Sequence, residues 1–298
     1  SPQPPTLAFP ADMVTCQDFE QTFTWNAVPN AIDYTLQVSK LSNFGAKILD
    51  TVISGTTLNY KVNEYFQDYF WRVKSRTPGC ETDYSEVRQF RTVVGPPMLQ
   101  APADSAKGQL LTIDLTWPAT AGAQTYDLQV ADDQNFQSLL VDETNYNSET
   151  YQFSTPTYNK RFWWRLRTNG QGCASEWSES NTFITAFPAV TPVSPTSDDL
   201  CVPINTEFTW LSLSGANKYE LQASKTENFN GTDILFEDIA VVGTSVIGDV
   251  TEASSRIYWR VRVNNDDNFG VWSATQDYFT TGDEPIALSP MEGEVEVH

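Results

Sequence analysis

Few residues in this chain are suited to covalent or acid–base chemistry. The single histidine is His298, the last residue, so no Ser–His or Cys–His nucleophile and no histidine-based zinc site is expected. The sequence contains no glycine-rich phosphate loop. The four cysteines are far apart and lack CxxC spacing, which disfavours a zinc cluster; they are Cys16, Cys80, Cys173 and Cys201. Disulfide formation is the covalent chemistry left to consider, and we expect no catalytic residue, metal site or cofactor.

Acidic side chains are plentiful but have no partner motif. The 298 residues include 38 Asp and Glu against 18 Lys and Arg, which gives a net charge of -20. So many carboxylates form close pairs by chance, and solvated surface charge explains them without catalysis. Two oxygen-rich stretches, 132–135 and 264–268, lack the spacing of a calcium loop and suit ordinary turns. The acidic surface disfavours nucleic acid, and no apolar run is long enough for membrane insertion.

The chain repeats one long phrase three times. Residues 34–44 read YTLQVSKLSNF, residues 126–136 read YDLQVADDQNF, and residues 219–229 read YELQASKTENF. A period this long is a whole domain rather than a solenoid turn. We predict three modules, at residues 1–94, 95–187 and 188–283. Residues 284–298 repeat the opening of a module, so we expect a truncated fourth module and a longer parent protein.

Each module has the alternating pattern of antiparallel β-structure. Residues 34–38 and 69–74 alternate apolar with polar side chains, and helical periodicity is absent. About seven short strands in each module predict three tandem two-sheet β-sandwiches in an elongated array. The recurring aromatic residues occupy inward positions, so we expect them to form the cores. The predicted core residues are Trp25, Tyr34, Trp71, Trp117, Tyr126, Trp164, Trp210, Tyr219 and Trp259. We expect the outward arginines beside them, Arg72, Arg165 and Arg260, to lie flat against neighbouring aromatic rings.

Each module resembles a fibronectin type III domain. The resemblance consists of a second-strand Trp, then Ala-x-x-Tyr-x-Leu-Gln, Asn-Phe, a sixth-strand Tyr-Trp-Arg-Val-Arg and a final Trp-Ser, in that order. The resemblance covers essentially the whole chain. The pattern is similar to that of the variant found in tandem in bacterial secreted and surface proteins. The resemblance implies the immunoglobulin-like sandwich fold. It implies little about function, because the family is a reused structural module.

On the fold that this resemblance implies, the cysteines lie at the ends of modules. Cys16 and Cys201, each nine residues before a second-strand Trp, would face the next module. Cys80 and Cys173, each nine residues after a sixth-strand Trp, would face the previous one. The two ends of one sandwich are roughly 20–25 Å apart, whereas a disulfide needs Cα atoms within about 7 Å. We therefore expect a Cys16–Cys173 bridge between modules.

Alternatives to this bridge are an internal Cys16–Cys80 bridge and four free thiols. The next junction lacks both cysteines, since residues 106–108 read AKG and residue 268 is Asn. Cys80 and Cys201 would then pair with neighbouring modules of the parent chain. The linkers, 93–97 and 186–192, are short and proline-rich, which favours a stiff connection.

These features favour a non-catalytic extracellular spacer or stalk of a larger surface or secreted protein, with a possible role in adhesion. An oxidised bridge would fit an exported location. The first alternative is a module that binds a glycan or an unknown protein partner, for example through Trp163 and Trp177 of the second module. An exposed aromatic patch found only on that module would favour it. The second alternative is an accessory tail of a secreted hydrolase.

Overall fold

The computed structural model describes residues 3–282. All the regular secondary structure in this part of the chain is β-strand. No helix in this part of the chain is long and apolar enough to cross a membrane. The predicted start of a fourth module, residues 284–298, lies outside the described residues. Backbone contacts divide the chain into two compact units. The first unit holds residues up to Ser105, 113–153 and 162–183, and the second holds 106–112, 154–161 and the chain from Ile184 onward.

The unit boundary passes through the second sequence repeat, and the three-module division stays a prediction. Below, the first, second and third repeats denote residues 3–94, 95–187 and 188–282.

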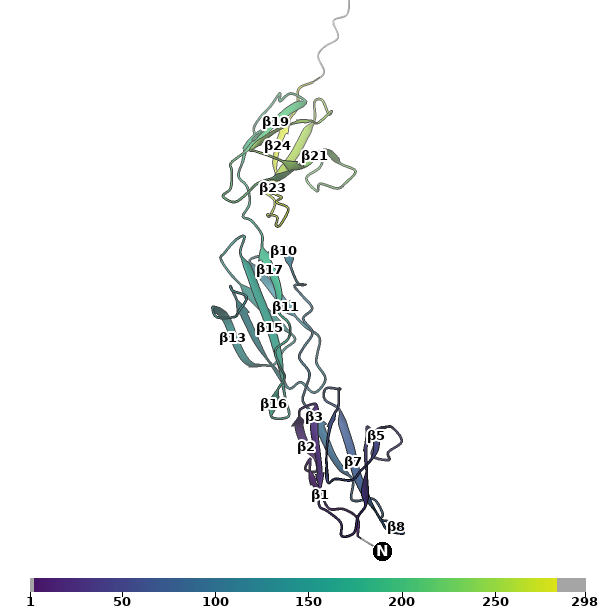
Figure 1. Cartoon of the computed structure of the whole chain (residues 1–298). Coiled ribbons are helices and arrows are strands. Elements are labelled where there is room, and N and C mark those ends of the chain that lie inside the picture. Colours follow the sequence, from purple (N-terminus) through teal and green to yellow (C-terminus); the bar gives the residue numbers. More distant parts are fainter. Residues whose placement is uncertain (1–2, 283–298) are drawn as a thin grey trace, which may run out of the picture. The chain divides into compact units, whose positions relative to one another are not determined.

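Two facing sheets make up the first repeat. One has the order β1-β3-β6, from Leu7–Phe9, Glu20–Trp25 and Thr57–Lys61. The other has the order β2-β9-β7-β4-β5, from Val14–Gln17, Arg88–Thr92, Asp68–Thr77, Asp33–Ser39 and Lys47–Ile53. Strands β2, β7 and β5 of this sheet are labelled in Figure 1. A short β8, Cys80–Glu81, pairs with the end of β7. All these pairs are antiparallel except β2 with β9, which run parallel.

The other repeats keep this order of strands, but in the described residues the smaller sheet of the second repeat has no counterpart of β1 and the larger sheet of the third has no counterpart of β2. In the third repeat one sheet is β18-β19-β22, from Pro192–Ser194, Asn205–Trp210 and Ser245–Asp249. Its second sheet is β21-β20-β23-β24, from Ile234–Val241, Tyr219–Ser224, Arg256–Val263 and Gln276–Phe279. The second repeat pairs β11 with β14, Thr112–Thr116 with Thr150–Ser154. Its larger sheet is β10-β17-β15-β12-β13, from Ala106–Gln109, Asn181–Thr185, Arg161–Gly170, Thr125–Ala131 and Leu139–Tyr146, and β16, Cys173–Ala174, pairs with β15. The predicted all-β sandwich class is confirmed.

Aromatic residues from both sheets fill each core. Along β7 the side chains alternate strictly, so Tyr69, Trp71 and Val73 are buried while Phe70, Arg72 and Lys74 point outward. All nine predicted core residues are at most 3% exposed, and each aromatic ring of this size contributes on the order of 2–3 kcal/mol by burial. They are Trp25, Tyr34, Trp71, Trp117, Tyr126, Trp164, Trp210, Tyr219 and Trp259.

The core tyrosine also holds a loop in each repeat. Its hydroxyl oxygen accepts a backbone N–H six residues upstream, from Val28 at 2.9 Å, Thr120 at 3.0 Å and Leu213 at 3.1 Å. Its ring lies 5.4 to 5.7 Å from the second-strand indole. The loop between the second-strand Trp and the core Tyr is therefore fixed relative to the core. This loop lies at one end of the sandwich.

The outer face explains the rest of the repeated phrase. The Arg72 guanidinium lies 3.9 Å from the ring centroids of both Phe44 and Tyr84, and its Nε and Nη2 donate to Gln37 Oε1. Arg165 and Arg260 have the same surroundings in their repeats. The Gln and Phe of the phrase thus hold a stacked arginine on the sheet, as the sequence predicted for the arginines.

Tyr278 is a buried titratable group of the third repeat. It is fully buried, and its hydroxyl is 3.0 Å from Thr206 Oγ1. Burial raises the pKa of Tyr278 to about 12, although the hydrogen bond with Thr206 acts in the opposite direction. The folded protein therefore disfavours the phenolate that the unfolded chain forms near pH 10.

We predict that Tyr278 makes the third repeat sensitive to alkaline pH. Its stabilising contribution is complete below pH 10 and is lost as the pH rises toward 12, a loss of about 2 to 3 kcal/mol. The Tyr278→Phe variant lacks this titration. Urea unfolding of both proteins between pH 8 and 11.5 tests this, because the other tyrosines are common to both. Parallel stability curves for the two proteins would contradict the prediction.

Candidate functional site at the repeat junctions

A disulfide joins the first repeat to the second. Cys16 in β2 and Cys173 in β16 are bonded with their Cα atoms 6.0 Å apart, across 157 residues of sequence. Both residues belong to the first compact unit. The predicted Cys16–Cys173 bridge is therefore present, and the alternative Cys16–Cys80 pairing is wrong. Cys80 and Cys201 are free and exposed.

Close backbone packing accompanies this bridge. Gly122 has a positive φ of 79°, and a Cβ on it would lie 2.4 Å from the ring of Phe66. A Cβ on Gly170 would lie 2.2 Å from the carbonyl oxygen of Gly122 and 3.0 Å from Val94 Cγ1. Only glycine permits these approaches. The disulfide therefore closes a junction at which Phe66 and Val94 of the first repeat pack directly against glycine backbone of the second.

The second and third repeats meet through an asparagine instead. Asn268 is 1% exposed, and its Oδ1 accepts the backbone N–H of Gly108 at 2.8 Å. Its Nδ2 donates to Asn159 Oδ1 and to the Thr185 carbonyl oxygen, both at 2.9 Å. All four residues belong to the second compact unit. One side chain thus binds three separate segments of the preceding repeat.

The backbone conformation and the surroundings of Gly108 leave no room for a side chain. Its φ is 61°, and a Cβ on it would lie 2.0 Å from the ring of Phe269. Phe187, itself buried, pairs with Gly270 through a parallel β-bridge, and its N–H donates to the Phe269 carbonyl at 3.1 Å. The Lys107 ammonium also donates to a backbone carbonyl across this junction, that of Asp266. The second junction is therefore closed by hydrogen bonds and aromatic packing.

The two junctions use the same pair of positions. Gly108 lies nine residues before Trp117, as Cys16 does before Trp25, and both have a φ near 60°. Asn268 lies nine residues after Trp259, as Cys173 does after Trp164. We call these two positions the junction pair. Sequence reasoning found that both cysteines are absent here but missed the role of Asn268.

Side chains of both oxygen-rich loops form hydrogen bonds with backbone groups. The Asp133 carboxylate accepts the N–H groups of Asn135, Gln137 and Ser138 at 2.6 to 2.9 Å, and these hydrogen bonds lower its pKa despite some desolvation. In the 264–268 loop, Asn265 and Asn268 bond to backbone groups. Among residues 3–282 no group of three or more His, Cys, Asp or Glu side chains is placed to hold a metal ion.

Trp177 of the second repeat lies under arginine side chains, as its counterparts in the other repeats do. Trp163 and Trp177 are both half-buried. The guanidinium groups of Arg165 and Arg167 lie 4.6 and 4.8 Å from the Trp177 ring. Tyr84 and Trp272 occupy the same position in the other repeats, also beneath an arginine. The condition that would favour a glycan site on this repeat alone is therefore not met at Trp177.

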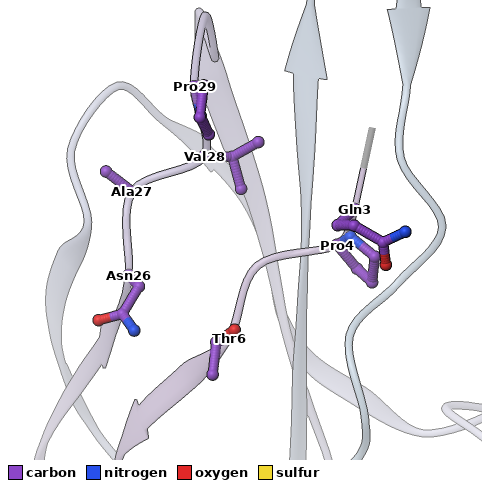
Figure 2. Close-up of a pocket in the computed structure, with 7 residues that line it drawn as sticks. All are labelled: Gln3, Pro4, Thr6, Asn26, Ala27, Val28 and Pro29. Carbon is purple, nitrogen blue, oxygen red and sulfur yellow. The ribbon is translucent and has the colours of Figure 1, made fainter. Parts of the chain in front are cut away.

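A hollow of about 410 Å³ lies at the end of the first repeat, where its chain begins. Figure 2 shows its lining, which is apolar or uncharged and contains no titratable side chain. The lining residues are Gln3, Pro4, Thr6, Asn26, Ala27, Val28 and Pro29. Such a surface can receive an apolar side chain but offers no acid, base or nucleophile.

No family model and no curated protein matches this chain. Among solved structures, the crystal structure of the FN1–FN3 domains of chicken CNTN1 is similar, with a TM-score of 0.40 and 15% sequence identity. The match covers 94% of this chain and 99% of that chain.

We predict that Asn268→Ala loosens the second junction. The change leaves the Gly108 N–H and the Thr185 carbonyl without partners, which costs about 2–4 kcal/mol at a buried site. Hydrogen-exchange mass spectrometry should show faster exchange in the peptide containing Gly108, by a factor of at least about ten. Asn264→Ala is the matched control, because the Asn264 side chain donates an exposed hydrogen bond to the Ile239 carbonyl of its own repeat. Equal protection in the two variants would contradict the assignment.

We also predict that Gly108→Ala is more destabilising than Gly172→Ala. Both glycines have positive φ, so both substitutions carry a backbone cost of about 1 kcal/mol. Only Gly108 faces a ring, whereas nothing lies within 4 Å of a Cβ on Gly172. Overlap with Phe269 should add about 1–3 kcal/mol. Calorimetric unfolding of both variants measures the difference, and equal losses would show that Phe269 moves aside freely.

Proposed function

We propose that this chain is a non-catalytic extracellular spacer whose successive repeats are fastened end to end. The observation that carries the proposal is the Cys16–Cys173 bridge between two sequence repeats. A disulfide within one repeat would stabilise that repeat only. A disulfide between repeats restricts their relative motion, which is useful when the repeats must hold a distance.

The chemistry of the bridge supports an exported location. Disulfides persist in oxidising compartments, while cytosolic thiols are kept reduced. The tandem sequence pattern further suggests a bacterial secreted or surface protein as the parent. The acidic composition suits a soluble surface component.

The bridge also changes how the chain carries tension. Force applied at the two ends passes from Cys16 directly to Cys173, which is 157 positions further along the chain, and bypasses the segment between them. Most of the first two repeats is then shielded from unfolding under load. A spacer that must keep its length gains from this arrangement, whereas a binding module gains nothing from it.

Other roles have less support. The described residues contain no patch restricted to the second repeat at Trp177 and no metal cluster, so nothing in them favours a glycan site or a hydrolytic site. Adhesion would depend on a partner whose chemistry the described surface does not specify. We therefore propose the spacer alone.

The force path gives the test of this proposal. In single-molecule pulling from the two termini, the oxidised chain should extend about 530 Å less than the reduced chain, since each extended residue spans about 3.4 Å. Adding reductant should release this hidden length. The Cys16→Ser/Cys173→Ser double variant is the control and should extend fully in either condition. Equal lengths for the oxidised and reduced native chain would refute the proposal.

A further inference from the structure

The two free cysteines occupy the two positions of the junction pair. Cys201 lies nine residues before Trp210 and has a φ of 59°, the same value as Cys16. Cys80 lies nine residues after Trp71 and pairs with Thr77 across a tight hairpin, as Cys173 pairs with Gly170. Each exposed thiol therefore lies where its counterpart in another repeat forms a disulfide.

At each junction, the two residues that neighbour the junction pair are chemically complementary. Thr15 and Gln171, both polar, line one hollow at the first junction. At the second junction the same positions hold Lys107 and Asp266, which share a hydrogen bond. The equivalent positions beside the free cysteines are Leu200 and Pro78. Both are exposed and apolar, and Leu200 is 70% exposed.

The hollow of Figure 2 also has a counterpart at the first junction. Its lining residues 26–29 are equivalent to residues 118–121, which line a hollow of about 280 Å³ at the first junction. There Tyr65 and Phe66 of the preceding repeat form part of the lining. Cys80 lies at the same end as the Figure 2 hollow, because the Ile32 N–H donates to the Arg76 carbonyl of the Cys80 hairpin strand.

We propose that the end of the third repeat that carries Cys201 and the end of the first repeat that carries Cys80 are two halves of one further junction. The occupant of either half is another repeat of this kind, which presents the complementary cysteine and a matching neighbour. A second copy of the chain, arranged head to tail, supplies it. This inference deepens the proposed spacer function, since it extends the covalent fastening beyond one molecule.

The bond formation is a two-electron oxidation. The Cys201 thiol and the Cys80 thiol of the other copy lose two electrons and two protons as the S–S bond forms. A low-molecular-weight disulfide such as glutathione disulfide accepts the electrons and becomes two glutathione thiols, through a mixed-disulfide intermediate.

Two single variants test the pairing. Cys80→Ser retains only the free Cys201 thiol, and Cys201→Ser retains only the free Cys80 thiol. Each variant alone, and an equal mixture of both, is incubated in a glutathione redox buffer and analysed by non-reducing electrophoresis. Peptide mass mapping identifies the linked residues. We expect the Cys201–Cys80 dimer in the mixture to exceed either homodimer by at least about tenfold. Homodimers in the proportions of random collision would overturn the proposal.

A surface variant separates docking from thiol exposure. Leu200→Asp, made in the Cys80→Ser chain, places a charge opposite Pro78 and should reduce the mixed dimer at least threefold. Ile247→Asp is the matched control, because Ile247 is an exposed apolar residue of β22 in the same repeat. An unchanged yield with Leu200→Asp would overturn the proposal. Neither measurement involves the Cys16–Cys173 bond, so this inference and the spacer function can fail independently.

Discussion

Burial of one indole on each sheet determines where both ends of a repeat lie. The residue nine positions before the second-strand Trp forms one half of a junction, and the residue nine positions after the sixth-strand Trp forms the other. In the first repeat Trp25 and Trp71 are buried on facing sheets. Because those rings cannot move without opening the core, the short segments that lead to Cys16 and Cys80 have fixed starting points. A precise end-to-end fit follows from the packing of the interior.

The two junctions achieve the same closure by different physical means. A disulfide acts largely by restricting the unfolded chain, and a loop of 157 residues gives about 5 kcal/mol in the chain-entropy treatment. The Asn268 carboxamide contributes less, because each of its hydrogen bonds replaces one with water. Its removal is nevertheless costly, since it leaves buried backbone groups unpaired. The first junction therefore depends on the redox state of its surroundings, and the second does not.

The core residues and the disulfide between repeats could be predicted from the sequence. Trp25 and its equivalents recur at inward positions, and alternation alone predicts their burial. Cys16 and Cys173 were paired by combining their places in the fold with the short reach of a disulfide. Asn268 could not be assigned in this way. An asparagine in an oxygen-rich loop suits a turn equally well, and its partners come from three segments that only the tertiary structure brings together. The glycine at position 108, which is equivalent to Cys16, is a signal that the sequence does contain, because glycine is the residue best suited to a left-handed backbone.

Charge explains why a covalent bond is suited to joining such repeats. At a net charge of -20, two copies of this chain repel each other once their surfaces are within about 8–10 Å, because physiological salt screens charges only beyond that distance. A small contact such as Leu200 against Pro78 cannot offset both this repulsion and the loss of translational freedom on association. A disulfide can, because it converts a brief encounter into a permanent link once the thiols are aligned. The apolar neighbours and the open hollow then have a limited task, which is to hold Cys201 and Cys80 in register long enough for exchange.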